Sequence, residues 1–174
     1  FAVPNAKSAE WAQAQAGGRR TVVTLPNAID VKAFARTSGS ARAESRRALG
    51  LEGEGRVLVQ VSALTDRKGV LELAKAFLAL PPCDRPQTKL IFVGDGDRRA
   101  ELEALAAKSE GAIRLLGQLP PDEVRRVLWA ADAFVLNTRL DPNPLSAIEA
   151  AAAGLPIVLS AAAGNVQEVV EVPQ

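Results

Sequence analysis

The sequence reads RVLVQVS at residues 56–62, GVLELAKAFLAL at residues 69–80 and KLIFVG at residues 89–94. The first and third segments are short, continuous apolar runs, which are typical of strands buried on both faces. The second segment has its apolar residues at helical spacing. Strand, helix and strand in this order predict a βαβ unit, in which a right-handed crossover joins two parallel strands.

The same alternation continues toward the end of the chain. Helices are predicted at residues 97–108, 121–131 and 144–153, and strands at residues 112–116, 133–137 and 156–160. Asp97 is a candidate N-cap for the first of these helices, and Pro121 suits the first turn of the second. We therefore expect the α/β class, as a doubly wound parallel sheet with helices on both faces.

The chain upstream of residue 56 follows a different pattern. We predict a strand end at residues 1–4, a helix at 6–16 stopped by Gly17-Gly18, a strand at 21–25, and a short helix at 41–49 stopped by Gly50. We interpret residues 1–36 as the tail of a preceding domain, residues 37–55 as a linker, and residues 56–174 as a ligand-binding domain that is incomplete at its end. The chain has no initial Met, begins in the middle of a pattern and ends without a closing helix, so we expect a fragment of a larger protein. Its first residues do not have the pattern of a signal peptide.

The composition excludes several classes of protein. The 174 residues include 21 Lys and Arg and 20 Asp and Glu, and a net charge of +1 gives no general attraction for DNA or RNA. Histidine is absent, which excludes a Ser-His-Asp triad, and the single Cys83 allows neither a disulfide framework nor a cysteine zinc site. No apolar run in the sequence is long enough to span a membrane. These features favour a reducing, cytoplasmic location.

Ligands of open parallel sheets bind beyond the carboxyl ends of the strands. On the helix predicted after one of these ends, Glu149 is the sharpest signal, because it is the only charged side chain between residues 142 and 167. A carboxylate can accept hydrogen bonds from two neighbouring hydroxyl groups, so Glu149 suits a ribose. The alternative is a partly exposed helix residue without a ligand.

A phosphate site is predicted beside Glu149. Asn143 is a candidate N-cap, and Pro144 suits the first helical position. The N–H groups of Leu145 and Ser146, with the Ser146 hydroxyl, would then point toward the crevice and favour an anion. Lys68 follows the first predicted strand of the domain and would face the same crevice. The alternatives are ordinary helix capping and a solvated lysine, and the order Lys-Gly is not a Walker loop.

Gly94-Asp95-Gly96 follows the second strand and opens a helix. It resembles part of the dinucleotide fingerprint, but Arg99 stands where the third glycine belongs. A tight strand-to-helix turn is the better interpretation, and a nicotinamide oxidoreductase is accordingly disfavoured.

Several segments, taken in order, resemble one known family. They are PNAID (residues 26–30), LTDRKG (64–69), IFVGDG (91–96), IRLLGQLP (113–120), ADAFVLNT (131–138), DPNPLSAIEAAAAGLP (141–156) and GNVQEVV (164–170). The ordered set resembles the carboxyl-terminal half of the retaining glycosyltransferases of family 4. The resemblance implies the Rossmann-like half of a GT-B fold, which binds a nucleotide-diphosphate sugar and needs no metal or other cofactor.

The resemblance also implies roles for individual residues. Of the implied catalytic residues, Lys68 would contact the donor diphosphate, Glu149 would hold the ribose, and Asp141, at the first position of the family's Glu-x7-Glu motif, would lie near the donor sugar. Gln118 and Leu119 would meet the base through their backbone. The substrate-binding set is completed by Gly94 and by Asn143, Pro144, Leu145 and Ser146, the last four around the sugar and the phosphates.

The sequence departs from the family at several positions. Ala63 stands where the family has a second phosphate-binding cation, and a lost charge-assisted hydrogen bond costs about 1.5–3 kcal/mol. Asp141 is one methylene shorter than the usual Glu. Gly164-Asn165 and Asn27-Ala28 replace Gly-Gly and Asn-Gly. Two alternatives to a transferase therefore stay open: a non-catalytic nucleotide-sugar binding module and a GT-B nucleotide-sugar epimerase.

The resemblance predicts a nucleotide sugar and a glycan, lipid or small-molecule acceptor as partners, and no nucleic acid. A preceding domain, missing from this fragment, would supply most of the acceptor site. The fragment alone is therefore expected to be inactive. A lipid-linked acceptor would bring the protein to the inner membrane surface through that domain.

Overall fold

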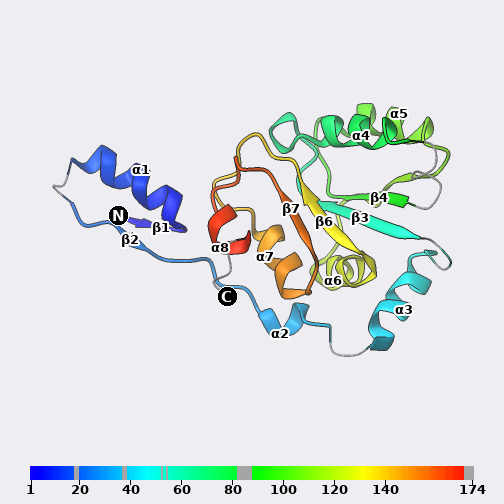
Figure 1. Ribbon diagram of the computed structural model, residues 1–174, viewed down its shortest axis with the longest axis horizontal. Helices are drawn as coiled ribbons and strands as arrows, with labels where there is room; N and C mark the ends of the chain where they lie inside the picture. The colour runs from blue at the N-terminus through cyan, green and yellow to red at the C-terminus, as the bar shows by residue number, and fades with distance from the viewer. Residues whose placement is uncertain (18–19, 37–38, 52, 54, 82–87, 171–174) are drawn as a thin grey trace.

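The computed structural model describes residues 1–17, 20–36, 39–51, 53, 55–81 and 88–170. Its larger sheet has the strand order β5-β4-β3-β6-β7, and every neighbouring pair is parallel (Figure 1). The strands are β3 (Arg56–Val61), β4 (Thr88–Val93), β5 (Ile113–Leu115), β6 (Ala133–Leu136) and β7 (Ile157–Leu159). The predicted parallel sheet is confirmed, and each strand end lies within one residue of its predicted position.

Helices cover both faces of this sheet (Figure 1). They are α4 (Val70–Leu78) and α5 (Arg99–Ala107) on one face, and α6 (Pro121–Ala130) and α7 (Leu145–Ala152) on the other. The side chains of β4 alternate between two cores: Leu90 and Phe92 pack with α4 and α5, whereas Ile91 and Val93 pack with α6 and α7. Because both faces are buried, these four residues are all apolar. The expected doubly wound α/β architecture is confirmed.

The strand order reverses at β3, because β4 and β5 continue to one side of it and β6 and β7 to the other. Doubly wound folds bind ligands in the crevice at such a switch point. Gly69, just before α4, lets the loops after β3 and β6 meet there. Its φ is +63°, and a Cβ atom on it would lie 1.9 Å from the Asn137 carbonyl oxygen, so the position requires glycine.

A smaller unit precedes the main sheet and lies at one end of the molecule (Figure 1). In it, β1 (Ala2–Val3) and β2 (Val23–Thr24) form a parallel two-stranded sheet beside α1 (Ala6–Ala16). The bounds of α1 are those predicted, and Gly17 ends the helix in the left-handed conformation. We call residues 1–17 and 20–25 the N-terminal unit.

The segment between the two sheets packs against the main sheet. It contains α2 (Val31–Phe34) and α3 (Gly39–Ala48). Phe34 and Leu51 are buried in the core shared with α6 and α7. Arg42 and Arg46 on α3 form ion pairs with Asp132, the residue before β6. Part of the predicted linker is thus anchored on the main sheet, and the division into residues 1–36, 37–55 and 56–174 stays a prediction.

Two helix starts differ from the prediction. The N-cap role of Asp97 is wrong, because a turn hydrogen-bonded from Arg99 to Gly96 comes first and Arg98 is the N-cap of α5. The N-cap role of Asn143 is also wrong. Pro144 is the N-cap of α7 rather than its first helical residue.

Three short elements have no counterpart in the sequence prediction. They are α2, the 3-10 turn η1 (Asp66–Lys68) and α8 (Val166–Val170). Each is too short to repeat an apolar period, which is the signal that sequence patterns provide. Gly18, a predicted helix stop, residues 37–38, 52 and 54 of the predicted linker, Cys83 and residues 171–174 lie outside the described residues.

Candidate functional site

Two loops form the centre of the candidate site, one after β3 and one after β6. The loop after β3 contains η1 and ends in Lys68 and Gly69. Thr138, after β6, donates through Oγ1 to the Arg67 carbonyl at 2.9 Å. The buried Gln60 on β3 donates through Nε2 to the Lys68 carbonyl at 3.0 Å. These two bonds hold the main chain that carries the Lys68 side chain.

Lys68 and Asp141 form an ion pair between Nζ and Oδ2. Their side chains are only 12% and 9% exposed, respectively. The two residues are 73 positions apart, so the strand order brings them together. The structure thus joins a predicted phosphate-binding cation to a predicted sugar-binding carboxylate. An anion that binds Lys68 would have to compete with Asp141 for its ammonium group.

The segment 141–144 packs against the loop after β7. The Gly164 N–H donates to the Asp141 carbonyl at 2.7 Å. A Cβ atom on Gly164 would lie 1.9 Å from the Pro142 carbonyl oxygen, so this position also requires glycine. The buried Asn165 donates through Nδ2 to the Pro144 carbonyl at 3.2 Å. Asn165, a departure from the family pattern, therefore helps to hold the segment that carries Asp141.

The amino end of α7 follows directly after this segment. Leu145 and Ser146 are its first residues, and the N–H groups of a first helical turn have no carbonyl partner within the helix. These groups and the helix dipole favour an anion at this end. Asn143, although not the N-cap, stays beside this end and donates its backbone N–H to Asp141 Oδ1 at 3.3 Å.

Glu149 lies one turn further along α7, three residues after Ser146 and therefore on the same side of the helix. The residue is half-buried, and burial raises the pKa of its carboxyl group above the usual value. Among the residues that the structure describes, no side chain or backbone group pairs with this carboxylate. The arrangement leaves its two oxygens available to ligand hydroxyl groups.

Gly94, Gln118 and Leu119 lie further along the same edge of the sheet, after β4 and β5. The Gly94 N–H donates to the Gly117 carbonyl at 2.7 Å, and a Cβ atom on Gly94 would lie 1.9 Å from the Ser62 carbonyl oxygen. The predicted tight turn is therefore present. Gln118 is exposed, and Leu119 is half-buried against the core. Within the described part of the chain, no hydrogen bond links these residues to the ion pair of the central loops.

Two residues at the site, Arg67 and Asn5, were not predicted from the sequence. Arg67 donates through Nη1 to the Leu140 carbonyl at 2.9 Å and so links the central loops. Asn5 comes from the N-terminal unit and donates through Nδ2 to the Pro142 carbonyl at 2.6 Å. An asparagine before a predicted helix signals an N-cap but not a contact 137 residues away.

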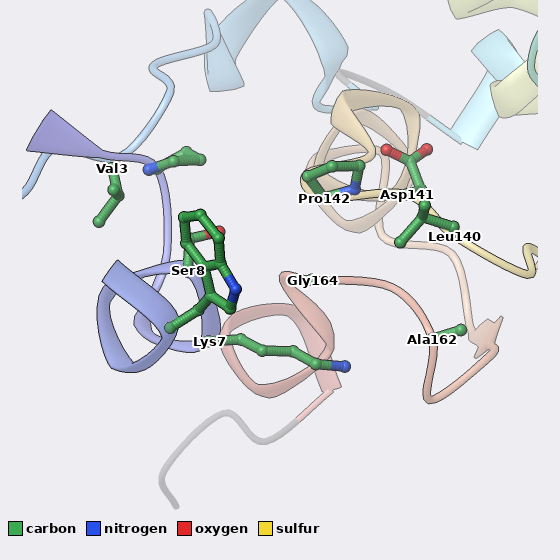
Figure 2. A pocket seen from close by; sticks show the side chains of 10 residues that line it. Val3, Lys7, Ser8, Leu140, Asp141, Pro142, Ala162 and Gly164 are labelled. Carbon is green, nitrogen blue, oxygen red and sulfur yellow. The ribbon is translucent and has the colours of Figure 1, made fainter. Parts of the chain in front are cut away.

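A cavity of about 510 Å³ lies between the N-terminal unit and the segment that carries Asp141 (Figure 2). Most of its lining is apolar, and Asp141 is among the residues of one wall. The lining residues are Val3, Pro4, Lys7, Ser8 and Trp11 on one side and Leu140, Asp141, Pro142, Ala162 and Gly164 on the other.

Neither a metal cluster nor a membrane helix is found in the described part of the chain. No group of three or more His, Cys, Asp or Glu among those residues could hold a metal ion. No helix that they form is long and apolar enough to cross a membrane. The expectation that the protein needs no metal stays a prediction.

Comparison with known proteins gives a consistent result. A family profile described as "Glycosyl transferases group 1" matches residues 41–172. A GDP-mannose-dependent monoacylated alpha-(1-6)-phosphatidylinositol monomannoside mannosyltransferase of Corynebacterium glutamicum is 30% identical over 155 residues, which cover 85% of this chain and 40% of that protein.

Solved structures show the same architecture. Anabaena Alr3699/HepE in complex with UDP has a TM-score of 0.80 and 26% identity, with 95% of this chain and 46% of that chain covered. WaaG, a glycosyltransferase involved in lipopolysaccharide biosynthesis, has a TM-score of 0.82 at 24% identity, with 98% and 46% covered. The chain thus spans less than half the length of these three proteins. Its fold is the Rossmann-like half of the GT-B fold, and the chain belongs to the group 1 glycosyltransferases.

Proposed function

We propose that this chain is the donor-binding part of a retaining glycosyltransferase of family 4, which moves a glycosyl group from a nucleotide-diphosphate sugar to an acceptor. One observation carries the proposal. This chain belongs to the group 1 glycosyltransferases, and the loops after its strands β3 and β6 hold the Lys68–Asp141 ion pair. Nearby, α7 carries Glu149, whose carboxylate has no partner among the described residues. A cation, a helix amino end and a carboxylate are the groups that a diphosphate and a ribose require.

The proposed chemistry is electrostatic rather than proton transfer. Transfer passes through an oxocarbenium-like state while negative charge grows on the leaving diphosphate. Lys68 and the amino end of α7 stabilise that charge, so the mechanism calls for no metal ion. Asp141 orients the sugar hydroxyl groups and Glu149 holds the ribose, which lowers the entropic cost of reaching the reactive geometry.

The remaining predicted residues have positioning roles in this proposal. Asn143, Pro144, Leu145 and Ser146 surround the sugar and phosphates. Gln118 and Leu119 meet the base through their backbone, and Gly94 allows the close turn beside them. The names of the relatives contain different nucleotides, GDP-mannose in one and UDP in another. The identity of the nucleotide base that this chain binds is therefore a question for the titrations described below.

The acceptor side belongs to the longer protein. We propose that a preceding domain supplies most of the acceptor site, that the present 174 residues alone are inactive, and that the protein acts in the cytoplasm on a glycan, lipid or small-molecule acceptor. A lipid-linked acceptor would bring it to the inner membrane surface.

Ala63 supports a second candidate, a nucleotide-sugar binding module without catalysis. It is exposed after β3, where the family has a cation, and so the leaving diphosphate would lose one stabilising contact. Turnover separates the two candidates, because both predict binding. A GT-B epimerase would release a free isomerised sugar product instead of a glycosylated acceptor.

The test is a titration of the full-length protein with nucleosides, nucleoside diphosphates and their sugar conjugates, followed by NMR of the products. We expect diphosphates to bind much more tightly than nucleosides, and Lys68→Ala to remove most of that difference, at about 1.5–3 kcal/mol. Lys75→Ala, on the exposed side of α4, is the matched control. Equal losses for nucleoside and diphosphate would contradict the proposed role of Lys68, and inversion at the anomeric carbon would contradict retention.

A further inference from the structure

Asn5 joins the N-terminal unit to the candidate site through a buried side chain. It is 1% exposed and is the N-cap of α1, where its Oδ1 accepts a hydrogen bond from the Ser8 N–H at 2.9 Å. Its Nδ2 donates to the Pro142 carbonyl at 2.6 Å and to Asn143 Oδ1 at 3.4 Å. One amide group thus uses its acceptor within α1 and its donors on the segment that carries Asp141.

Besides the bonds from Gly164 to the Asp141 carbonyl and from Asn165 to the Pro144 carbonyl, this segment has few means of holding its shape. Pro142 and Pro144 have no N–H, so the backbone between them can donate only through Asn143. That N–H is directed to Asp141 Oδ1 at 3.3 Å. The Pro142 carbonyl already lies against the backbone of Gly164, and Asn5 supplies its side-chain donor. The position of the Asp141 carboxylate therefore depends on a residue from outside its own loop.

The same contact sets which way the Asn143 amide faces. Because Asn5 Nδ2 is a donor, Asn143 must present Oδ1 to it. The Asn143 Nδ2 group is then turned away from Asn5, and it has no hydrogen-bond partner among the residues that the structure describes. Asn5 thus decides which atom of the Asn143 amide is left buried without a partner among the described residues.

From these contacts we infer that Asn5 is a positioning residue for the donor sugar, which acts by holding Asp141 and Asn143 in place. The inference rests on the proposed function, and it makes sugar binding depend on the docking of the N-terminal unit. Figure 2 shows Pro142 on the side of the cavity opposite α1, and the Lys7 side chain of α1 extending toward the segment of Ala162 and Gly164. Two exposed bonds, Ala6 N–H to Glu168 and Lys7 to the Ala161 carbonyl, support the same docking.

Asn5→Asp separates this role from helix capping. Aspartate caps a helix as well as asparagine does, so α1 keeps its bond from Ser8. It has no donor, however, and places a carboxylate oxygen against the Pro142 carbonyl. Gln13→Glu, on the exposed side of α1, makes the same amide-to-acid change without touching the site and is the matched control.

The experiment titrates the full-length protein with a nucleoside diphosphate and its sugar conjugate. For Asn5→Asp we expect the affinity for the sugar conjugate to fall about tenfold, while the affinity for the free diphosphate does not fall. Gln13→Glu should leave both affinities unchanged. Equal losses for both ligands, or no loss for either, would overturn the inference. If Asn5→Asp does not fold, Asn5→Ser, which also caps but is too short to reach Pro142, takes its place with the same expectation.

A second readout needs no nucleotide. Acetic anhydride labelling followed by mass spectrometry reports how accessible Lys68 is, and displacement of Asp141 by Asn5→Asp should raise its labelling several-fold relative to Gln13→Glu. Unchanged labelling of Lys68 would overturn the inference. If the unaltered protein binds no nucleotide at all, the proposed function is wrong. The labelling of Lys68 still tests whether Asn5 holds Asp141 in place.

Discussion

Replacing Asp141 by asparagine should strengthen the binding of a free nucleoside diphosphate. In the structure the Asp141 carboxylate is paired with Lys68, the cation that we assign to the diphosphate. A diphosphate must therefore exchange one charge-assisted contact for another and approach a group of like charge. Asp141→Asn removes both penalties and leaves Lys68 to the ligand.

The size of the effect follows from the burial of the pair. Like charges 5 Å apart repel by roughly 3 kcal/mol at an effective dielectric constant of 20. The side chains of Lys68 and Asp141 retain 12% and 9% exposure, so solvent lowers that value. We expect a gain of about 1.4 kcal/mol, which is a tenfold tighter dissociation constant.

Asp141→Asn should also reduce the contribution of the sugar to the binding free energy and lower the stability of the fold. Asparagine cannot accept as many hydrogen bonds from sugar hydroxyl groups as a carboxylate, so the sugar conjugate should lose its advantage over the free diphosphate. Lys68 would remain largely buried without a counter-charge. We expect a loss of about 2 kcal/mol in the free energy of unfolding and a melting temperature lower by about 4–8 °C.

The assay is isothermal titration of the full-length protein with both ligands, together with thermal unfolding. Asp122→Asn is the control, since Asp122 on α6 has 76% side-chain exposure and pairs only with Arg125 among the described residues. If Asp141→Asn weakens the free diphosphate as much as the sugar conjugate, the two anions do not compete for Lys68. That result would refute the competition between the diphosphate and Asp141 for the Lys68 ammonium group.

Three further predictions concern stability. Glu149→Gln should raise the free energy of unfolding at pH 7 by about 0.5 kcal/mol and weaken nucleotide binding. Because burial raises the pKa of Glu149 in the folded protein, its carboxylate costs stability above that raised pKa, so the gain should vanish as the pH falls below the ordinary value of 4.5. A lower melting temperature with unaltered affinity would instead assign Glu149 a structural role. Gly69→Ala should cost about 3 kcal/mol or more in urea unfolding, because its Cβ would meet the Asn137 carbonyl oxygen, whereas Gly50→Ala, also at positive φ but with open space around it, should cost about 1 kcal/mol. Similar losses at both glycines would show that φ alone matters. Asp132→Asn should cost about 2 kcal/mol, since its carboxylate pairs with two arginines of α3 and accepts the Val57 N–H at 2.8 Å. An unchanged unfolding midpoint would show that this anchor contributes nothing.

The sequence by itself determined the elements of the main sheet and their class. Strands and helices of this length repeat their apolar pattern often enough to be identified, and apolar strands alternating with helices are compatible with few arrangements other than a parallel sheet. Helix starts were less certain. They depend on single hydrogen bonds, such as the bond from the Arg99 N–H to the Gly96 carbonyl in the turn before α5, and a single bond does not produce a repeating pattern in the sequence.

The sequence also indicated which edge of the sheet to search. The carboxyl ends of parallel strands share one edge, so Lys68 and Glu149 could be named as candidate site residues from their places after a strand and on the following helix, whereas Asp141 was named from the family resemblance. The sequence could not predict which of these charged side chains form ion pairs in the folded protein. Glu149 stands without a partner among the described residues because α7 places no cation beside it, whereas Lys68 is paired.

Only the tertiary structure decided the contacts between distant segments. Lys68 meets Asp141 across 73 positions and Asn5 meets Pro142 across 137. The first contact exists because the strand order reverses at β3, and the second because α1 docks beside the loop after β6. Local patterns reflect interactions over one or two turns of chain, while these contacts depend on how whole elements are ordered and packed.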